Sequence, residues 1–189
     1  MAIKLLAFAG SSKKGSQNQK LLDVAIAAAR TAGAEVTAVN LADYPMPIFS
    51  EDLEAEGVPE SVSSLKKLAI EHDGYLIASP EYNGSISPLL KNTIDWLSRK
   101  HGDEAHMAAY NGKIAAVMAA SPGGLGGIRA LPHLRYILEG IGVMVVPETI
   151  ALGSSYQAFD DNGNLKDEGM QQRVVAMAKR LMEVTSSKP

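Results

Sequence analysis

Short apolar runs alternate with amphipathic segments along the whole chain. The apolar runs cover residues 3–9, 35–41, 74–78, 113–120 and 143–150. Segments with helical spacing of apolar positions lie between and after them, at residues 19–32, 61–71, 89–99, 127–140 and 168–183. Strands that are apolar at nearly every position are typical of a parallel sheet covered by helices on both faces. The pattern therefore predicts an α/β fold with three layers and a doubly wound sheet.

The number of strand–helix units narrows this prediction. The chain of 189 residues contains five strand–helix units, and the second half of a dinucleotide-binding Rossmann fold is absent. We therefore expect a flavodoxin-like, five-stranded parallel sheet in the order 2-1-3-4-5, within a single domain spanning residues 1–189. Residues 185–189 are expected to form a frayed tail. Pro132 lies early in the fourth helical segment and should delay its start or kink it.

Composition excludes several classes of function. The net charge is -3, with acids and bases interspersed, so neither nucleic acid nor an anionic membrane is an expected partner. The longest apolar stretch is shorter than the roughly 20 residues that span a bilayer, and the N-terminal run is too short for a signal peptide. These features predict a cytoplasmic protein.

The chain contains no cysteine, so thiol redox chemistry, disulfides and cysteine metal sites are excluded, and any electron transfer requires a bound cofactor. The four histidines have no recognisable metal-ligand spacing, and no Ser/His/Asp arrangement can be defined. We therefore expect no metal site and no catalytic side chain.

Three loops rich in Gly, Ser, Pro and Asn follow the first, third and fourth apolar runs. They are residues 10–18, 80–85 and 121–127, named here the first, second and third loops. In an open parallel sheet, ligands bind beyond the carboxyl ends of the strands, where the strand order reverses. We therefore expect the three loops to meet at one edge of the sheet and to form a binding site.

The first loop has the features of an anion site. Backbone N–H groups at the start of a helix attract an anion, and the helix dipole adds to the attraction. Hydroxyl, amide and ammonium groups would complete a phosphate cradle, and the candidates are Ser11, Lys13, Ser16, Gln17 and Asn18. The alternative is that Ser16 begins an ordinary capping box and that the lysines are merely solvated.

Other phosphate-binding motifs fit the first loop poorly. The loop lacks G-x-G-x-x-G, and the second strand ends near Asn40 rather than at an acid suited to a ribose. Gly10 and Gly15 have the spacing of a P-loop, but Ser16 stands where that motif needs lysine. A phosphate-accepting signalling domain of this fold would need acids at the end of the first strand, which here ends in alanine and glycine.

The second loop could hold a flat heteroaromatic ring such as a flavin. It reads Pro80-Glu81-Tyr82-Asn83-Gly84-Ser85, and its backbone N–H groups cannot all be used in secondary structure. The alternative is an ordinary Asn-Gly turn followed by the helix cap Ser87-Pro88. The third loop has four glycines in seven residues, which lets its backbone approach a ligand closely. Its alternative is a flexible turn before a helix.

Together these motifs resemble the NADPH-dependent FMN reductase family, small flavodoxin-like flavoenzymes that include bacterial chromate, azo-dye and quinone reductases. The similarity runs from residue 3 to about residue 152. It rests on Gly10-Ser11…Ser16-x-Asn18, Pro80-Glu81-Tyr82-Asn83-Gly84-Ser85, Leu90-Lys91-Asn92-x-Ile94-Asp95-Trp96 and Ser121-Pro122-Gly123-Gly124.

The resemblance implies FMN as the cofactor and NADPH or NADH as the electron donor. Ser11, Ser16 and Asn18 would hold the FMN phosphate, with Lys13 beside them. Residues 80–84 would hold the edge of the flavin ring, largely through backbone N–H groups, and its other side would be lined by Ser121, Gly123 and Gly124. Many relatives have arginine where this chain has Lys13, and a lysine offers a point charge instead of a planar fork.

The activity that the resemblance implies is a two-electron, ping-pong reduction of a small-molecule acceptor: a quinone, with chromate or an azo compound as further candidates. A homodimer or homotetramer is also implied, with residues 44–49 near the subunit interface. Two alternatives remain. One is a reductase that releases reduced FMN to a partner, and the other is a non-catalytic electron carrier like flavodoxin, for which a charge of -3 is weak.

Overall fold

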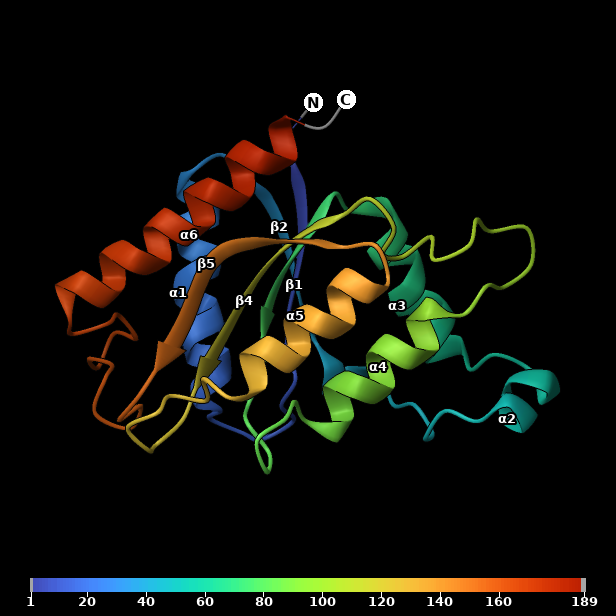
Figure 1. Cartoon of the computed structure of the whole chain (residues 1–189), viewed down its shortest axis with the longest axis horizontal. Helices are drawn as coiled ribbons and strands as arrows, with labels where there is room; N and C mark the ends of the chain where they lie inside the picture. Colours follow the sequence, from blue (N-terminus) through green and yellow to red (C-terminus); the bar gives the residue numbers. More distant parts are fainter. Residues whose placement is uncertain (1, 188–189) are drawn as a thin grey trace.

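Five parallel strands form one central sheet in the computed structural model, which describes residues 2–187. All neighbouring strands pair in parallel, in the order β2-β1-β3-β4-β5 (Figure 1). The strands are β1 (Lys4–Ala9), β2 (Glu35–Asn40), β3 (Gly74–Ala78), β4 (Ile114–Ala120) and β5 (Met144–Leu152). The predicted flavodoxin-like, doubly wound fold is confirmed.

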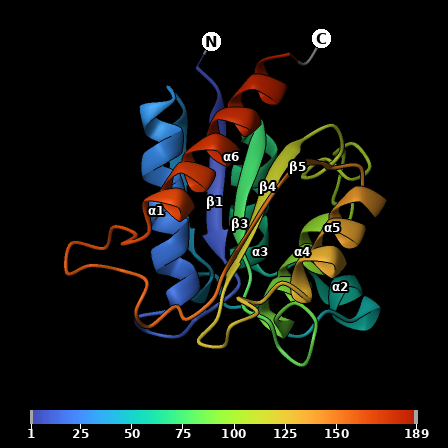
Figure 2. The same ribbon diagram turned by 60° about the vertical axis from the view of Figure 1, so that its left-hand side comes forward.

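Helices cover both faces of the sheet (Figure 2). One face packs against α1 (Gln17–Thr31) and α6 (Glu168–Ser186), and the other against α3 (Glu60–Glu71), α4 (Pro88–Ser98) and α5 (Ala130–Gly140). Successive strand residues point to opposite faces, so Leu5 and Ala7 belong to one apolar core while Leu6 and Phe8 belong to the other. A sheet buried on both faces explains why its strands are apolar at nearly every position.

Three helix ends differ from the sequence prediction. The first helix starts at Gln17, so Asn18 lies in its first turn. The α5 helix starts at Ala130 instead of residue 127, which agrees with the delayed start expected from Pro132; the proline falls in the first turn, where a missing N–H removes no helical hydrogen bond. The α6 helix continues through the buried Thr185 to Ser186, so the start of the expected tail is helical. Residues 188–189 lie outside the described residues.

The connection between β2 and α3 contains two short elements that were not predicted, η1 (Leu41–Asp43) and α2 (Glu51–Glu56). Between them, Pro47 accepts hydrogen bonds from the buried Trp96 Nε1 at 2.7 Å and from Asn92 Nδ2 at 2.9 Å. The N–H of Phe49 donates to Asn92 Oδ1 at 2.8 Å. Two side chains of α4 thus hold residues 44–49 in place, while Ile48 remains 84% exposed.

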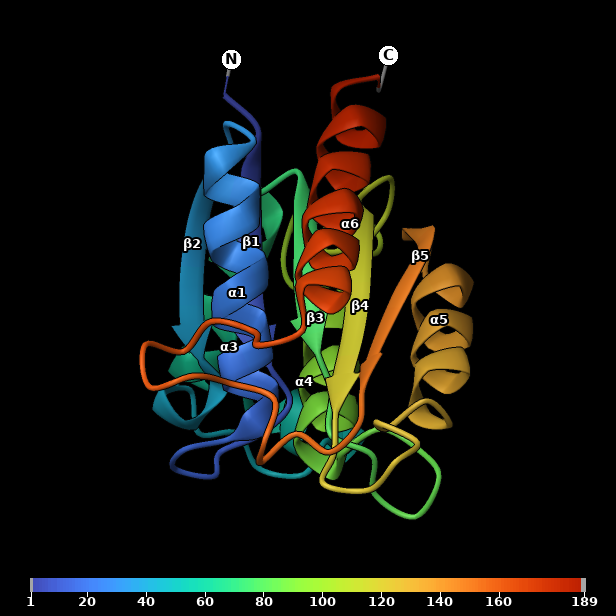
Figure 3. The same cartoon turned by 90° about the vertical axis from the view of Figure 1, so that its left-hand side faces the viewer.

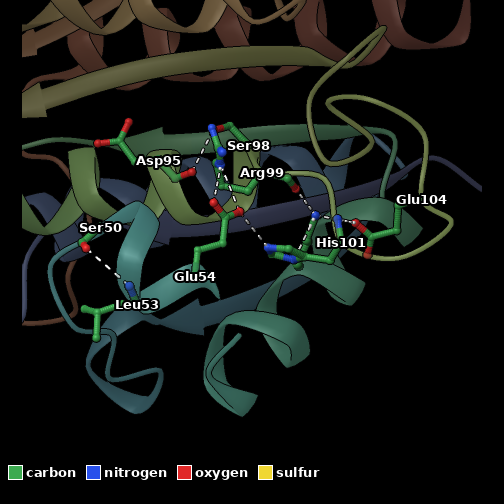
Figure 4. A network of polar contacts seen from close by, with 9 residues as sticks. Ser50, Leu53, Glu54, Asp95, Ser98, Arg99, His101 and Glu104 are labelled. Carbon is green, nitrogen blue, oxygen red and sulfur yellow. Dashed lines mark hydrogen bonds and ion pairs between the residues drawn. The ribbon is translucent and has the colours of Figure 1, made fainter. Parts of the chain in front are cut away.

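A polar network holds the segment that follows α4 (Figure 4). The side chain of Lys66 is 1% exposed, and its ammonium group contacts the Arg99 carbonyl, the Glu104 carboxylate and His101 Nδ1, the last at 3.3 Å. Arg99 Nε donates to both carboxylate oxygens of Glu54 at 3.0 Å, and His101 Nε2 lies 3.7 Å from the same carboxylate. These contacts, here named the Lys66 network, join α2, α3 and the segment after α4.

The Lys66 network predicts loss of stability in acid. Burial, helped by the charge of Lys66, lowers the pKa of His101. Burial alone would raise the pKa of Glu104, but the hydrogen bond and charge of Lys66 lower it overall. In both cases the unfolded chain binds a proton where the folded chain does not, so the free energy of unfolding falls as the pH decreases.

The melting temperature should therefore drop in two stages, first as the pH falls below the ordinary histidine pKa of 6.5 and then below the ordinary glutamate pKa of 4.5. Thermal unfolding between about pH 7.5 and about pH 3 measures this. His101→Gln should remove the upper stage only. A melting temperature that is constant or rises over this range contradicts the prediction.

Among residues 2–187, no helix is long and apolar enough to cross a membrane.

Candidate functional site

The first, second and third loops lie together at the carboxyl ends of β1, β3 and β4, as predicted (Figure 3). Residues 153–158, which follow β5 and are named here the fourth loop, join them. A pocket of about 270 Å³ lies between the four loops. It is lined by Ser11, Lys13, Ser16, Gln17, Asn18, Pro80, Glu81, Tyr82, Ala120, Ser121, Pro122 and Tyr156. Of the predicted site residues, only Asn83, Gly84, Gly123 and Gly124 are not part of this lining.

A neighbouring cavity of about 510 Å³ shares Ser11, Lys13 and Ser16 with this pocket and extends past the first loop to Asn40 at the end of β2. This cavity also contains Lys14 and Lys20, which add positive charge beside the first loop. The first loop therefore borders open space on two sides.

The start of α1 keeps hydrogen-bond donors free for an anion. Ser16 caps the helix by accepting from the N–H of Gln19 at 3.4 Å. The Gln19 side chain donates to Asp23 at 2.9 Å instead of reaching back, so only half of a capping box forms. Within residues 2–187, the N–H groups of Gln17 and Asn18 have no acceptor, and the buried Gln17 Oε1 has no partner. The two N–H groups lie at the positive end of the helix dipole and can donate to an anion there.

The side chain of Asn18 has a partner within the chain. Its Nδ2 donates to the carbonyl of Ala120, and its Oδ1 accepts from the N–H of Ala120, both at 2.9 Å. The structure thus uses the amide to join the start of α1 to the end of β4, rather than leaving it free to face a phosphate. What remains for a ligand is the main-chain N–H and one amide hydrogen.

Ser87 and Gly10 connect the first loop to α4. The Ser87 hydroxyl donates to the carbonyl of Gly10 at 2.6 Å and accepts from the N–H of Leu90 at 3.2 Å, which caps α4. A Cβ atom at Gly10 would lie 2.8 Å from the Cβ of Leu90. Glycine is therefore needed here, because the loop passes too close to α4 for any side chain.

The second loop turns sharply at Asn83 and Gly84. Backbone hydrogen bonds of 2.9 and 3.0 Å join Tyr82 and Ser85, and both central residues have positive φ, 52° and 83°. This is the Asn-Gly turn with two left-handed residues that the alternative interpretation expected. The turn uses the N–H of Tyr82, but the N–H groups of Asn83 and Gly84 have no acceptor among residues 2–187. An ordinary turn therefore also provides two donors for a ligand.

Glu81 pairs with Arg129, a residue that the sequence analysis did not single out. The carboxylate is 8% exposed and accepts from Arg129 Nε at 2.6 Å and from the Arg129 N–H at 3.1 Å. This ion pair holds the second loop against the start of α5. Both carboxylate oxygens already accept from this one arginine, so the ion pair supports the structure of the loop. No pattern in the sequence pairs these residues, which lie 48 positions apart.

The fourth loop was also missed, although it begins Gly153-Ser154-Ser155, a composition like that of the other three. The N–H groups of Ser154 and Ser155 donate to the carbonyls of Gly123 and Ser121 at 3.3 and 3.1 Å. The fourth loop therefore packs along the third and carries Tyr156 into the pocket.

The arrangement suits a ligand with an anionic end and a flat polar end. Helix N–H groups, two serine hydroxyls and Lys13 gather at one end, and the Asn83–Gly84 donors lie on the neighbouring loop. Free N–H groups at the helix start and the unpartnered Gln17 oxygen are the features that a phosphate ester with a polar chain would satisfy. Among the described residues, no group of three or more His, Asp or Glu side chains could hold a metal.

Known proteins with similar sequences agree with the resemblance that the sequence motifs showed. The family model for NADPH-dependent FMN reductase matches residues 3–157. A NAD(P)H:quinone oxidoreductase of Solanum tuberosum is 36% identical, over 93% of this chain and 89% of that protein. A NAD(P)H-dependent FMN reductase of Pseudomonas aeruginosa is also 36% identical, over 88% of this chain and 86% of that protein.

Among solved structures, FerB, a flavoenzyme NAD(P)H:acceptor oxidoreductase of Paracoccus denitrificans, superposes with a TM-score of 0.79 at 30% identity, over 96% of this chain and 98% of that one. Sequence motifs, fold and site geometry agree with these matches. The chain belongs to the NADPH-dependent FMN reductase family.

Proposed function

We propose that this protein binds FMN in the pocket between the four loops and transfers two electrons from NADH or NADPH to a quinone. The observation that carries the proposal is a pocket lined by a helix start with free donors, with two further free donors, at Asn83 and Gly84, on the turn of the adjoining second loop. As a member of its family, the chain is an NAD(P)H-dependent oxidoreductase that uses FMN. The quinone reductases among its relatives support the class of acceptor.

The first loop would hold the FMN phosphate. The N–H groups of Gln17 and Asn18 would donate to phosphate oxygens, joined by the hydroxyls of Ser11 and Ser16. Lys13 would add a positive charge. Two of these groups are main-chain atoms, so the affinity depends on where α1 starts as well as on the side chains.

The second and third loops would hold the flavin ring. The N–H groups of Asn83 and Gly84 would donate to the ring edge, and Ser121, Gly123 and Gly124 would line its other side. Bound FMN supplies the two-electron chemistry, taking hydride from the nicotinamide and passing it to the acceptor. The chain contributes orientation and fixed donors that favour a negatively charged ring. Glu81 is paired with Arg129, which leaves it unsuited to act as a base.

The finer features of the proposal concern acceptors, assembly and location. Chromate and azo compounds are further candidate acceptors, since a ring reached from the sheet edge is open to small molecules. A homodimer or homotetramer is supported by the exposed Ile48 on a segment that α4 holds rigidly. We also propose that the protein acts in the cytoplasm, where NADH and NADPH are available as electron donors.

Steady-state kinetics test the function. With NADPH and a benzoquinone as substrates, double-reciprocal plots should give parallel lines, because donor and acceptor must take turns at one ring face. Intersecting lines contradict this order of events. Turnover with free FMN far above that with quinone points instead to a flavin-releasing reductase. FMN binding without oxidation of NADH or NADPH would indicate an electron carrier.

A further inference from the structure

Tyr156 occupies an unusual position at the edge of the pocket. Its side chain is 65% exposed although it belongs to a lining that also includes the buried Ser16 and Asn18. The ammonium group of Lys13 lies over its ring, 5.9 Å from the centroid. An aromatic ring at this distance attracts a cation through its negative face.

The backbone that carries Tyr156 is held firmly. Ser155 is fully buried and its N–H donates to Ser121, while the preceding N–H donates to Gly123. A Cβ atom at Gly153 would lie 2.6 Å from the carbonyl oxygen of Gly124, so the fourth loop is pressed against the third. The exposed ring is therefore attached to a rigid support, and its position is defined relative to the first loop.

Lys13 has little else to orient it. Among residues 2–187, no carboxylate lies within ion-pair distance of its ammonium group, and the other charged residue of the pocket, Glu81, is paired with Arg129. A lysine side chain has four flexible bonds, so an unrestrained ammonium group is poorly organised for binding a phosphate. The Tyr156 ring is the group that limits its freedom.

We propose that Tyr156 is a positioning residue for the phosphate of FMN: its ring holds the Lys13 ammonium group at the first loop, ready to pair with the phosphate. The proposal rests on the proposed FMN site. It assigns a role to a residue outside the three loops that the sequence predicted, and it makes the fourth loop part of the cofactor site.

Titrations of apoprotein with FMN and with riboflavin, followed by flavin fluorescence, test this role. Riboflavin lacks the phosphate, so only an effect that passes through the phosphate separates the two ligands. Tyr156→Leu should weaken FMN binding about two- to fivefold, the range of a cation–π contact at an exposed site, and leave riboflavin binding unchanged. Tyr156→Phe, which keeps the ring, should bind FMN like the parent.

A double-mutant cycle tests whether Tyr156 acts on FMN binding through Lys13. In a Lys13→Met background, Tyr156→Leu should have no further effect on FMN binding. Lys20 provides a matched control, because its ammonium group lies 5.8 Å from the centroid of the Phe159 ring and it lines the neighbouring cavity but not the pocket between the four loops. In a Lys20→Met background, which loses the same charge, Tyr156→Leu should still weaken FMN binding two- to fivefold.

Three results overturn the proposal: an equal loss of riboflavin affinity, an undiminished effect of Tyr156→Leu in the Lys13→Met background, or a Tyr156→Phe variant as weak as the leucine variant. If the proposed FMN site itself were wrong, the result would differ from these three, because the parent protein would then bind riboflavin as tightly as FMN.

Discussion

Replacing Lys66 with methionine should lower the free energy of unfolding by about 3 kcal/mol, the low end of the range for removing one partner of a buried ion pair. The substitution leaves the carbonyl of Arg99 and the carboxylate of Glu104 without their shared donor. The loss is at the low end because Glu104 is 31% exposed and water can reach its carboxylate. Urea unfolding followed by circular dichroism measures the change.

Lys67→Met is the matched control, because it makes the same substitution at an exposed position of the same helix. Its effect should be within about 0.5 kcal/mol of zero. The Lys66 network lies outside the pocket, so FMN affinity of the folded Lys66→Met protein should equal that of the parent. If Lys66→Met and Lys67→Met unfold at the same urea concentration, the network contributes no stability.

Replacing Asn18 with alanine should weaken FMN binding about tenfold or more and also lower the free energy of unfolding by about 2–4 kcal/mol. The variant loses two hydrogen bonds and leaves the buried N–H and carbonyl of Ala120 without partners. It also frees the first loop from the third, so that the phosphate and ring portions of the site are no longer held together. Calorimetric titration of apoprotein gives the affinity, and urea unfolding gives the stability.

Comparison with Ser16→Ala separates positioning from direct contact. Ser16→Ala removes a hydroxyl proposed to face the phosphate, so it should weaken FMN binding while leaving riboflavin binding nearly unchanged. Asn18→Ala should weaken both ligands, because the link to Ala120 places the loop beside the flavin ring. Unchanged riboflavin affinity in Asn18→Ala would show that this residue acts on the phosphate alone.

The sequence by itself determined the fold and the edge of the sheet that carries the site. Strands buried on both faces must be apolar throughout, and this local property is visible without any partner. The loops at the carboxyl ends could be located because turn and helix-cap chemistry is also local: the helix caps at Ser16 and Ser87 and the turn at Asn83-Gly84 each form within a few residues. Their geometry needed only the short-range rules of turns and caps.

The tertiary structure alone decided what several of those side chains do. Asn18 bonds to Ala120 across 102 positions, Glu81 pairs with Arg129, and Tyr156 joins the pocket from beyond the last strand. Such pairings depend on which strands become neighbours and how far each loop extends past the sheet. A single sequence contains no local signal for either, because the contact forms only once the sheet has assembled and brought distant loops to one edge.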